Sequence, residues 1–388
     1  MTYRQRINMS VLSPTIASDI ATIAYQARLK RKSISLQQNT KAHFKFDVSN
    51  VISGTSGGFF YRPTSGFVVA GEGVSEIYKR DIVLSFRGTK TLADGLTNAT
   101  ANPRGTQSGE LVHNGFQGTF NSMVPEIRAF VKNSKSDKLI NIHCVGHSLG
   151  GALATLAANW LKSSPEIKAK VHLYTFGAPR VGGKSFSMNA TQRVDSIFRC
   201  VNGADPVPKV PVWPFYHAPY NGTEYLSSRQ QGLDHTAHGI KRYAQLTEFQ
   251  SWEEIYSQKV ANAFERVVLN YNNRLETKQN EFWADKISAA ILTLLFDGGY
   301  ASAVFALQNL GSAISTIYDA IARSMVKISE LSSEFAERVK GLLGHMLVFA
   351  GKGAQIAIKF TYSFIRWVFE LVLSKLNQAV KAALKTTF

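Results

Sequence analysis

The sequence predicts an α/β fold with a mostly parallel sheet, followed by an all-helical C-terminal region. Between residues 65 and 201, short apolar strand-type runs alternate with helical segments, an order typical of a sheet whose strands are joined by helices. After about residue 250 the strand signals stop and long helical periodicity begins. We therefore expect residues 1–250 to form an α/β domain that includes an N-terminal helix, and residues 251–388 to form a helical, amphipathic region.

The elements of the α/β domain can be placed from their patterns. They are a helix at 17–31, strands at 65–70 and 81–87, a helix beginning near 123, and strands at 139–145, 170–176 and 196–201. Ligand and catalytic sites in parallel sheets form at the carboxyl ends of the strands. We therefore expect functional residues in the turns that follow these strands.

The C-terminal region carries two stretches, 302–340 and 352–385, in which polar residues recur every three or four positions in an otherwise apolar sequence. Gly341 and Gly344 are expected to separate two helices. The favoured use is packing within the chain. The alternatives are a helix in a bilayer interface with its basic stripe at the head groups and, least favoured, insertion of the uncharged segment 298–318.

The charge is strongly positive, with 44 Lys and Arg against 27 Asp and Glu, a net charge of +17. Such a field attracts the protein to anionic phospholipid or to nucleic acid. The basic residues are spread along the chain and no nucleic-acid motif occurs, so we expect an anionic membrane surface and no nucleic acid as partner.

Cysteines and the N-terminal residues bear on the expected location. Cys144 and Cys200 lie in apolar strand-type runs, which predicts buried free thiols. The first residues, MTYRQRINMSVLSPTIASD, contain no apolar stretch long enough for a secretory signal. We expect the protein to be cytoplasmic in the producing cell, with any export following a route that needs no cleaved signal.

The segment VGHSLGGALA, residues 145–154, places a G-x-S-x-G motif between a strand and a helix. Such a turn strains the serine backbone and lifts its hydroxyl above the sheet, and the flanking glycines let strand and helix pass closely. The start of the helix and the amide of Leu149 favour an oxyanion beside the serine. We predict that Ser148 is a nucleophile.

A serine nucleophile needs a base and an acid, which we expect later in the chain. Asp205, in the strand-end loop VNGADPVPKVP, is the predicted acid. The segment GLDHTAHGIKRYAQL offers two bases, and we prefer His238 to His235 because it lies at a junction of loop and helix where Tyr243 can pack behind it. His217 and His147 are expected to have structural roles.

Six motifs in one order resemble the class 3 lipase family of α/β-hydrolases over about residues 60–245. They are VLSFRGTKTLADGLTN (83–98), VHNGF (112–116), VGHSLGGALA (145–154), YTFGAPRVGG (174–183), VNGADPVPKVP (201–211) and YHAPYNGTEY (216–225). The resemblance implies the α/β-hydrolase fold, Asp205 as the acid, and an oxyanion hole formed by Thr89 and Leu149. Family members that act on lipids usually carry a helical lid, but residues 93–110 are polar and rich in Gly and Asn, so no hydrophobic lid is expected there.

These features predict a serine hydrolase that cleaves acyl esters of lipids through an acyl-enzyme, without a metal or cofactor. The net charge favours a phospholipase A that acts on membrane phospholipid. Alternatives are a triacylglycerol lipase, a soluble carboxylesterase and a non-enzymatic, membrane-perturbing helical protein. A lipase-like core without a signal peptide and with appended apolar helices also resembles antibacterial effectors of type VI secretion, which implies an immunity or secretion-system protein as partner.

Overall fold

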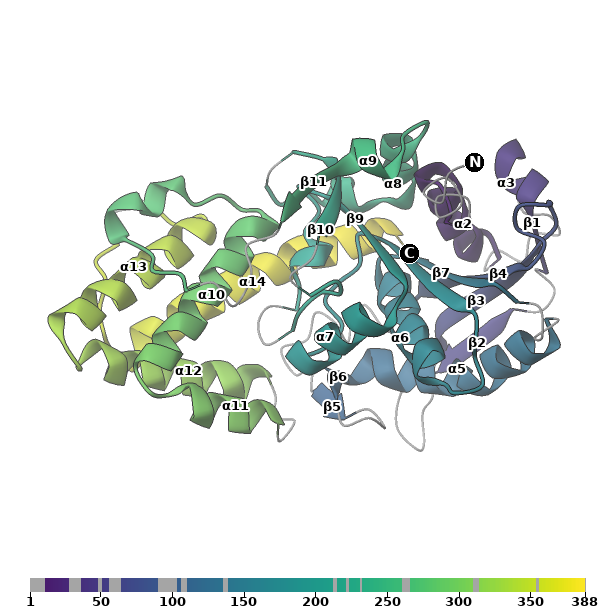
Figure 1. Cartoon of the computed structure of the whole chain (residues 1–388). Helices are drawn as coiled ribbons and strands as arrows, with labels where there is room; N and C mark the ends of the chain where they lie inside the picture. The colour runs from purple at the N-terminus through teal and green to yellow at the C-terminus, as the bar shows by residue number, and fades with distance from the viewer. Residues whose placement is uncertain are drawn as a thin grey trace.

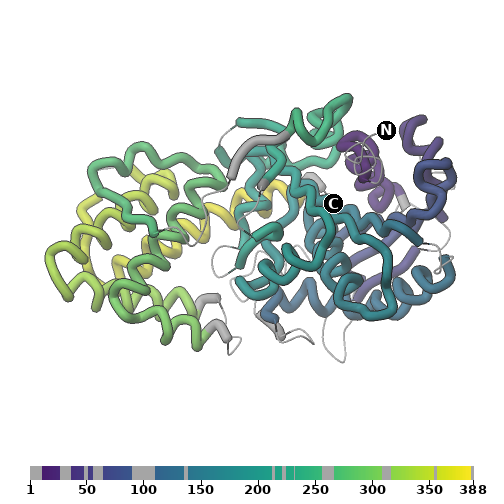
Figure 2. Tube along the Cα trace, viewed as in Figure 1, coloured from purple at the N-terminus to yellow at the C-terminus, as the bar shows by residue number. Residues whose placement is uncertain are grey.

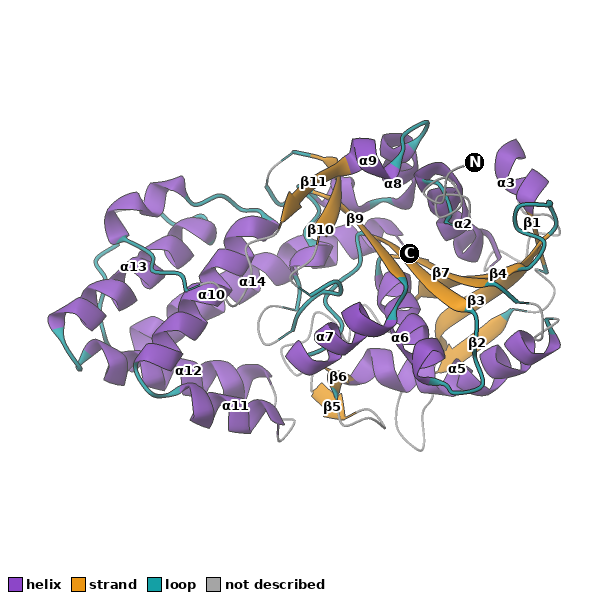
Figure 3. Ribbon diagram, in the orientation of Figure 1, coloured by secondary structure: helices purple, strands orange, loops and turns teal. Residues whose placement is uncertain are grey.

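The computed structural model describes residues 11–27, 36–47, 51–55, 64–89, 103–105, 110–134, 139–211, 215–220, 223–230, 232–259, 266–309, 314–353 and 356–387. An α/β part holds the strands, and a helical part lies beside it (Figures 1 and 3).

A nine-stranded sheet forms the centre of the α/β part, in the order β1-β3-β4-β7-β8-β9-β10-β11, with β2 paired to β3. The strands are β1 (Phe44–Phe46), β2 (Ile52–Thr55), β3 (Thr64–Gly73), β4 (Asp81–Gly88), β7 (Asn141–His147), β8 (Lys170–Phe176), β9 (Ser196–Asn202), β10 (Thr223–Ser228) and β11 (Tyr256–Lys259). The pairs from β4 to β10 are parallel, and the outer pairs are antiparallel. This is the mostly parallel sheet of the α/β-hydrolase fold, as predicted.

Strand β11 is a correction to the expectation that strands end before residue 250. It pairs antiparallel with β10 at the edge of the sheet. Its sequence, YSQK, has no run of apolar residues, because an edge strand that is short and polar needs none. The division of the chain at residue 250 stays a prediction.

Helices cover both faces of the sheet. The helices before residue 260 are α2 (Pro14–Ala27), α3 (Gln38–His43), α5 (Asn114–Asn133), α6 (Leu149–Ser163), α7 (Lys184–Arg193), α8 (Ile240–Thr247) and α9 (Trp252–Ile255). The chain also contains the short 3₁₀ turns η2 (Val207–Lys209), η3 (His235–His238) and η4 (Tyr271–Glu276) and a small separate ribbon of β5 (Pro103–Gly105) and β6 (Leu111–His113). Successive strand residues face opposite sides. Leu84 and Cys144 join the core under α5 and α6, whereas Val83 and Val145 join the core under α2.

The helical part consists of α10 (Glu281–Asp297), α11 (Ala301–Asn309), α12 (Ile314–Ser329), α13 (Ser333–Phe349) and α14 (Tyr362–Thr387). Gly341 and Gly344 do not separate two helices, because α13 continues through both. A Cβ atom on Gly341 would lie 1.8 Å from the carbonyl oxygen of Leu269, so glycine here lets a neighbouring segment pack directly on the helix. The next helix, α14, begins at Tyr362 and not at residue 352.

The apolar face of α14 is buried within the chain. Its buried residues are Ile365, Val368, Phe369, Val372, Leu376, Val380, Ala383 and Leu384. The helix runs from the helical part toward the α/β part (Figure 2). There it packs against η3. Many of these residues share one hydrophobic cluster with Leu84 and Cys144 of the sheet. Of the three uses considered for this segment, the structure shows packing within the chain.

No single helix among the described residues is both long enough and apolar enough to cross a bilayer. Helix α10 and residues 301–307 meet both requirements only as a pair, with a bend of 118° between them.

His172, in β8, is a buried histidine whose environment predicts acid sensitivity. Its Nε2 lies 3.1 Å from Asn141 Oδ1, and its ring stacks on His143. Burial and the neighbouring His143 lower the pKa of His172 to about 3. The unfolded chain therefore binds a proton at this histidine below about pH 6.5, before the folded protein does, so stability is lost as the pH falls toward 3.

We expect protonation of His172 in the unfolded chain to lower the free energy of unfolding by about 2 kcal/mol as the pH falls from 7 to 5. The His172→Gln variant should lose correspondingly less stability than wild type over the same interval. Denaturant titrations at both pH values measure the difference, which is independent of any constant effect of the substitution. Equal losses for the two proteins would contradict the prediction.

Candidate active site

Ser148 lies in a strained turn between β7 and α6, as the glycine pattern predicts. Its backbone has a positive φ of 57°. A Cβ atom on Gly146 would lie 2.3 Å from the carbonyl oxygen of Gly150, and one on Gly150 would lie 2.1 Å from that of Phe86. Glycine is therefore required at both positions for the strand and helix to approach this closely.

The structure brings Ser148, His238 and Asp205 together in one hydrogen-bonded line. The distance from Ser148 Oγ to His238 Nε2 is 2.7 Å, and that from His238 Nδ1 to Asp205 Oδ2 is 2.8 Å. All three side chains are buried. Because a carboxylate only accepts, Nδ1 carries the proton and Nε2 can accept the serine proton. This is the arrangement that activates a serine nucleophile.

Asp205 is fixed by donors on both carboxylate oxygens. Oδ1 accepts from the amide of Val207 at 2.9 Å, and Oδ2 accepts from the hydroxyl of Tyr243 at 2.7 Å. That hydroxyl in turn accepts from the amide of Asn202 at 3.0 Å. The sequence predicted packing for Tyr243, but the hydrogen bond to the carboxylate was not predicted. The carboxylate is thereby held toward His238.

The two candidate histidines have different environments. Both lie in η3, which follows Asp234. The amide of Asp234 donates to the carbonyl oxygen of Ala204 at 2.9 Å, so the segment that carries the two histidines is joined to the loop that carries Asp205, the acid loop. His238 is buried at the serine, whereas His235 is exposed. His217 faces the carbonyl oxygen of Pro208 at 2.8 Å and Glu281 at 3.1 Å, a structural position. The geometry favours His238, and its catalytic role stays a prediction.

The two predicted oxyanion donors are in different situations. Leu149 is the first residue of α6, so its amide is among those without a partner inside the helix. Thr89 donates its amide to the carbonyl oxygen of Ser65 and its hydroxyl to that of Thr64. In this conformation neither donor of Thr89 is available to an oxyanion, so its predicted role requires a change in the turn after β4. In the segment 93–110, where no hydrophobic lid is expected, residues 93–102 and 106–109 lie outside the described residues, and residues 103–105 form β5.

The sequence did not predict the hydrogen bonds of His147, for which only packing was expected. Its Nε2 lies 2.6 Å from the main-chain oxygen of His238, and its Nδ1 lies 2.7 Å from the hydroxyl of Tyr25. Tyr25 belongs to the N-terminal helix α2, and no motif marks it. His147 therefore contacts the backbone of His238, and Tyr25 contacts His147 in turn.

The helical part is joined to the sheet and to the segment after β8 by buried ion pairs. Arg199 of β9 contacts Glu281 of α10 at 3.0 Å and Glu224 of β10 at 2.7 Å, and Arg180 pairs with Asp285 of α10. Burial alone would raise the pKa of Glu281, but Arg199 and His217 lower it to well below its ordinary value. Because removing one member of such a pair leaves a buried charge unpaired, these contacts hold α10 at the sheet.

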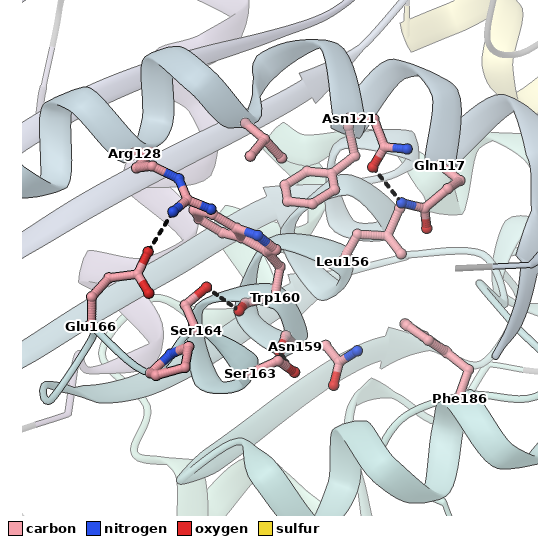
Figure 4. Close-up of a pocket in the computed structure, with 13 residues that line it drawn as sticks. Gln117, Asn121, Arg128, Leu156, Asn159, Trp160, Ser163, Ser164, Glu166 and Phe186 are labelled. Carbon is pink, nitrogen blue, oxygen red and sulfur yellow. Dashed lines mark hydrogen bonds and ion pairs between the residues drawn. The ribbon is translucent and has the colours of Figure 1, made fainter. Parts of the chain in front are cut away.

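A groove of about 630 Å³ lies between α5, α6 and α7, away from the triad (Figure 4). Its lining includes Phe120, Leu156 and Trp160, and its rim carries the ion pair of Arg128 and Glu166. None of its lining residues belongs to the triad, and those from α6 lie in the half of the helix remote from Ser148. An ester bound there would not meet the serine.

Comparisons with known proteins agree with the motifs. Residues 83–215 match the family Lipase (class 3). Phospholipase A(1) DAD1, chloroplastic, of Arabidopsis thaliana is 34% identical over 159 residues, which cover 36% of this chain and 36% of the relative. The secreted mono- and diacylglycerol lipase 1 of Fusarium solani is 31% identical over 166 residues, covering 42% of this chain and 49% of the relative. The chain thus spans half or less of the length of these curated relatives.

Among solved structures, the lipase from Rhizopus microsporus var. chinensis is similar over 58% of this chain and 75% of its own, with 21% identity and a TM-score of 0.42.

Proposed function

Because this chain belongs to the class 3 lipase family through residues 83–215, we propose that it is a serine hydrolase that cleaves acyl esters of lipids. The observation that carries the proposal is the hydrogen-bonded line from Ser148 through His238 to Asp205. This arrangement of a serine, a histidine and a carboxylate supplies the nucleophile, the base and the acid used in acyl transfer to a serine.

The proposed reaction has two halves. His238 Nε2 takes the proton of Ser148 as the serine oxygen attacks the acyl carbonyl, and the Leu149 amide stabilises the resulting oxyanion. Asp205 stabilises the imidazolium, which then gives its proton to the leaving alcohol. Water, deprotonated by His238, attacks the acyl-enzyme, and the fatty acid leaves as Ser148 regains its proton.

Phospholipid is the proposed substrate, and the activity is that of a phospholipase A. The net charge of +17 supports binding to anionic head groups, and one curated relative is named as a phospholipase A(1). Mono- and diacylglycerols are the second candidate, because other relatives are named as lipases of those substrates. Export without a signal peptide and an immunity or secretion-system partner stay predictions.

Fatty-acid release from three lipid preparations distinguishes these substrates. We expect release from phosphatidylglycerol vesicles to exceed that from phosphatidylcholine vesicles by roughly tenfold at low salt, and the excess to shrink in 0.5 M salt, because salt screens the attraction between surface charges. A monoacylglycerol emulsion serves as the third preparation, and the Ser148→Ala variant sets the background. Faster hydrolysis of the monoacylglycerol, with no response to lipid charge, would overturn the phospholipase assignment and leave the lipase assignment standing.

A further inference from the structure

The N-terminal helix α2 reaches the catalytic centre from outside the segment that matches the lipase family. The helix is fixed on both sides, since its Ile20 carbonyl accepts from Ser85 of β4 at 2.8 Å and its Ser18 contacts Thr247 of α8 at 3.0 Å. Tyr25 lies in the last turn of the helix and is partly buried, with its hydroxyl 2.7 Å from His147 Nδ1.

The direction of each hydrogen bond in this group follows from its chemistry. The main-chain oxygen of His238 only accepts, so the Nε2 of His147 must carry a proton. Burial, the neighbouring His238 and Arg87 hold the pKa of His147 well below its ordinary value, so the ring is neutral and Nδ1 is an acceptor. Tyr25 therefore donates its hydroxyl proton to Nδ1, and one tautomer of His147 is selected.

Tyr25 is itself positioned by a cation. The guanidinium of Arg87, itself buried, lies 4.6 Å from the centre of its ring and makes a cation–π contact. Arg87 belongs to β4, whose neighbour in the sheet is β7, the strand that ends at His147. The tyrosine is thus held by α2 on one side and by the end of β4 on the other.

His147 connects the nucleophile and the base directly. It precedes Ser148 in the chain, and its side chain is hydrogen-bonded to the backbone of His238. The ring centres of His147 and His238 are 4.7 Å apart. One imidazole therefore fixes the separation between the backbones that carry the two reacting side chains.

We propose that Tyr25 and His147 are positioning residues, which hold the backbone of His238 so that its ring spans Ser148 and Asp205. The proposal rests on the proposed serine hydrolase function. It gives the N-terminal helix a role in turnover and not only in packing. Losing this support is expected to lower the reactivity of Ser148 without changing how substrate binds, because neither residue lies among the groups expected to contact the ester.

The experiment measures the rate at which a fluorophosphonate labels Ser148, together with kcat and KM for a short-chain ester. The Tyr25→Phe variant keeps the ring under Arg87 but removes the hydroxyl. We expect its labelling rate and kcat to fall about tenfold, the rate equivalent of one ordinary hydrogen bond, with KM unchanged. His147→Phe should show at least the same loss, whereas His147→Gln, whose amide can donate to the His238 carbonyl, should recover most of the rate.

The Tyr78→Phe variant is the matched control, since Tyr78 is a buried tyrosine on the same side of the sheet whose hydroxyl donates to the carbonyl oxygen of Val11, at 3.4 Å. It should keep the wild-type labelling rate even where its melting temperature falls. Equal labelling of wild type and Tyr25→Phe overturns the positioning role, and this comparison decides the matter if His147→Phe does not fold. A wild type that is not labelled at all overturns the serine hydrolase proposal and the positioning role with it.

Discussion

Replacing Ser148 with alanine is expected to lower kcat for lipid ester hydrolysis by about 10⁴-fold or more while the protein stays folded. The hydroxyl is the atom that forms the acyl bond, and no other described side chain lies on His238 Nε2 at hydrogen-bonding distance. Alanine keeps the Cβ atom and so makes the same demand on the strained backbone at φ 57°. Fatty-acid release and thermal unfolding of the same preparation measure the two effects.

Ser163, an exposed serine at the other end of the same helix, provides the matched control. Its hydroxyl bonds to the carbonyl oxygen of Asn159 within α6. Ser163→Ala is expected to retain wild-type kcat. A Ser148→Ala protein with substantial turnover, or equal losses in the two variants, would refute the nucleophile assignment.

The two histidines of η3 are expected to respond very differently to alanine. His238→Ala should lower kcat by about 10⁴-fold, because it removes the proton acceptor of Ser148 and leaves the Asp205 carboxylate without its imidazole partner. His235→Ala should leave kcat within about twofold of wild type, since that side chain is exposed and surface substitutions usually have small effects. Initial rates of ester hydrolysis at saturating substrate give both values.

A large loss in His235→Ala with normal turnover in His238→Ala would reverse the assignment of the base. The comparison is internally controlled, because both substitutions lie in the same four-residue turn. General damage to this turn would affect both variants. Unequal losses of kcat therefore show which of the two histidines takes part in the reaction.

The sequence predicted the surroundings of Ser148 well because its signals are local. The glycines around the serine reflect contacts of 2.3 Å and 2.1 Å that only glycine avoids, and the apolar runs on either side reflect burial on both faces of the sheet. Choosing between His235 and His238 was harder. A three-residue spacing puts both on one side of a 3₁₀ turn, so their different depths depend on how the turn sits against the acid loop.

Outside the predicted triad, contacts between distant segments could not be predicted from the sequence. Tyr25 meets His147 across 122 residues of chain, and nothing in the pattern around either residue specifies the other. Similarly, Gly341 looks like a helix breaker in sequence, but in the structure it is the position where a helix receives the backbone at Leu269. The edge strand β11 was missed because its sequence, YSQK, carries no run of apolar residues that would predict a strand.

The hydrophobic cluster shared by the two parts has a consequence for how the chain melts. Leu84 and Cys144 of the sheet belong to the same buried cluster as Ile321, Leu343 and Val372 of the helices. Parts that share one core lose their packing together, so cooperative unfolding in a single calorimetric transition follows. A chain cut before α10 would leave apolar residues of the sheet's own loops, such as Val207 of η2, without their neighbours in α10 and α14. We therefore expect the helices to belong to the folding unit that holds the triad, so that their removal would destabilise it.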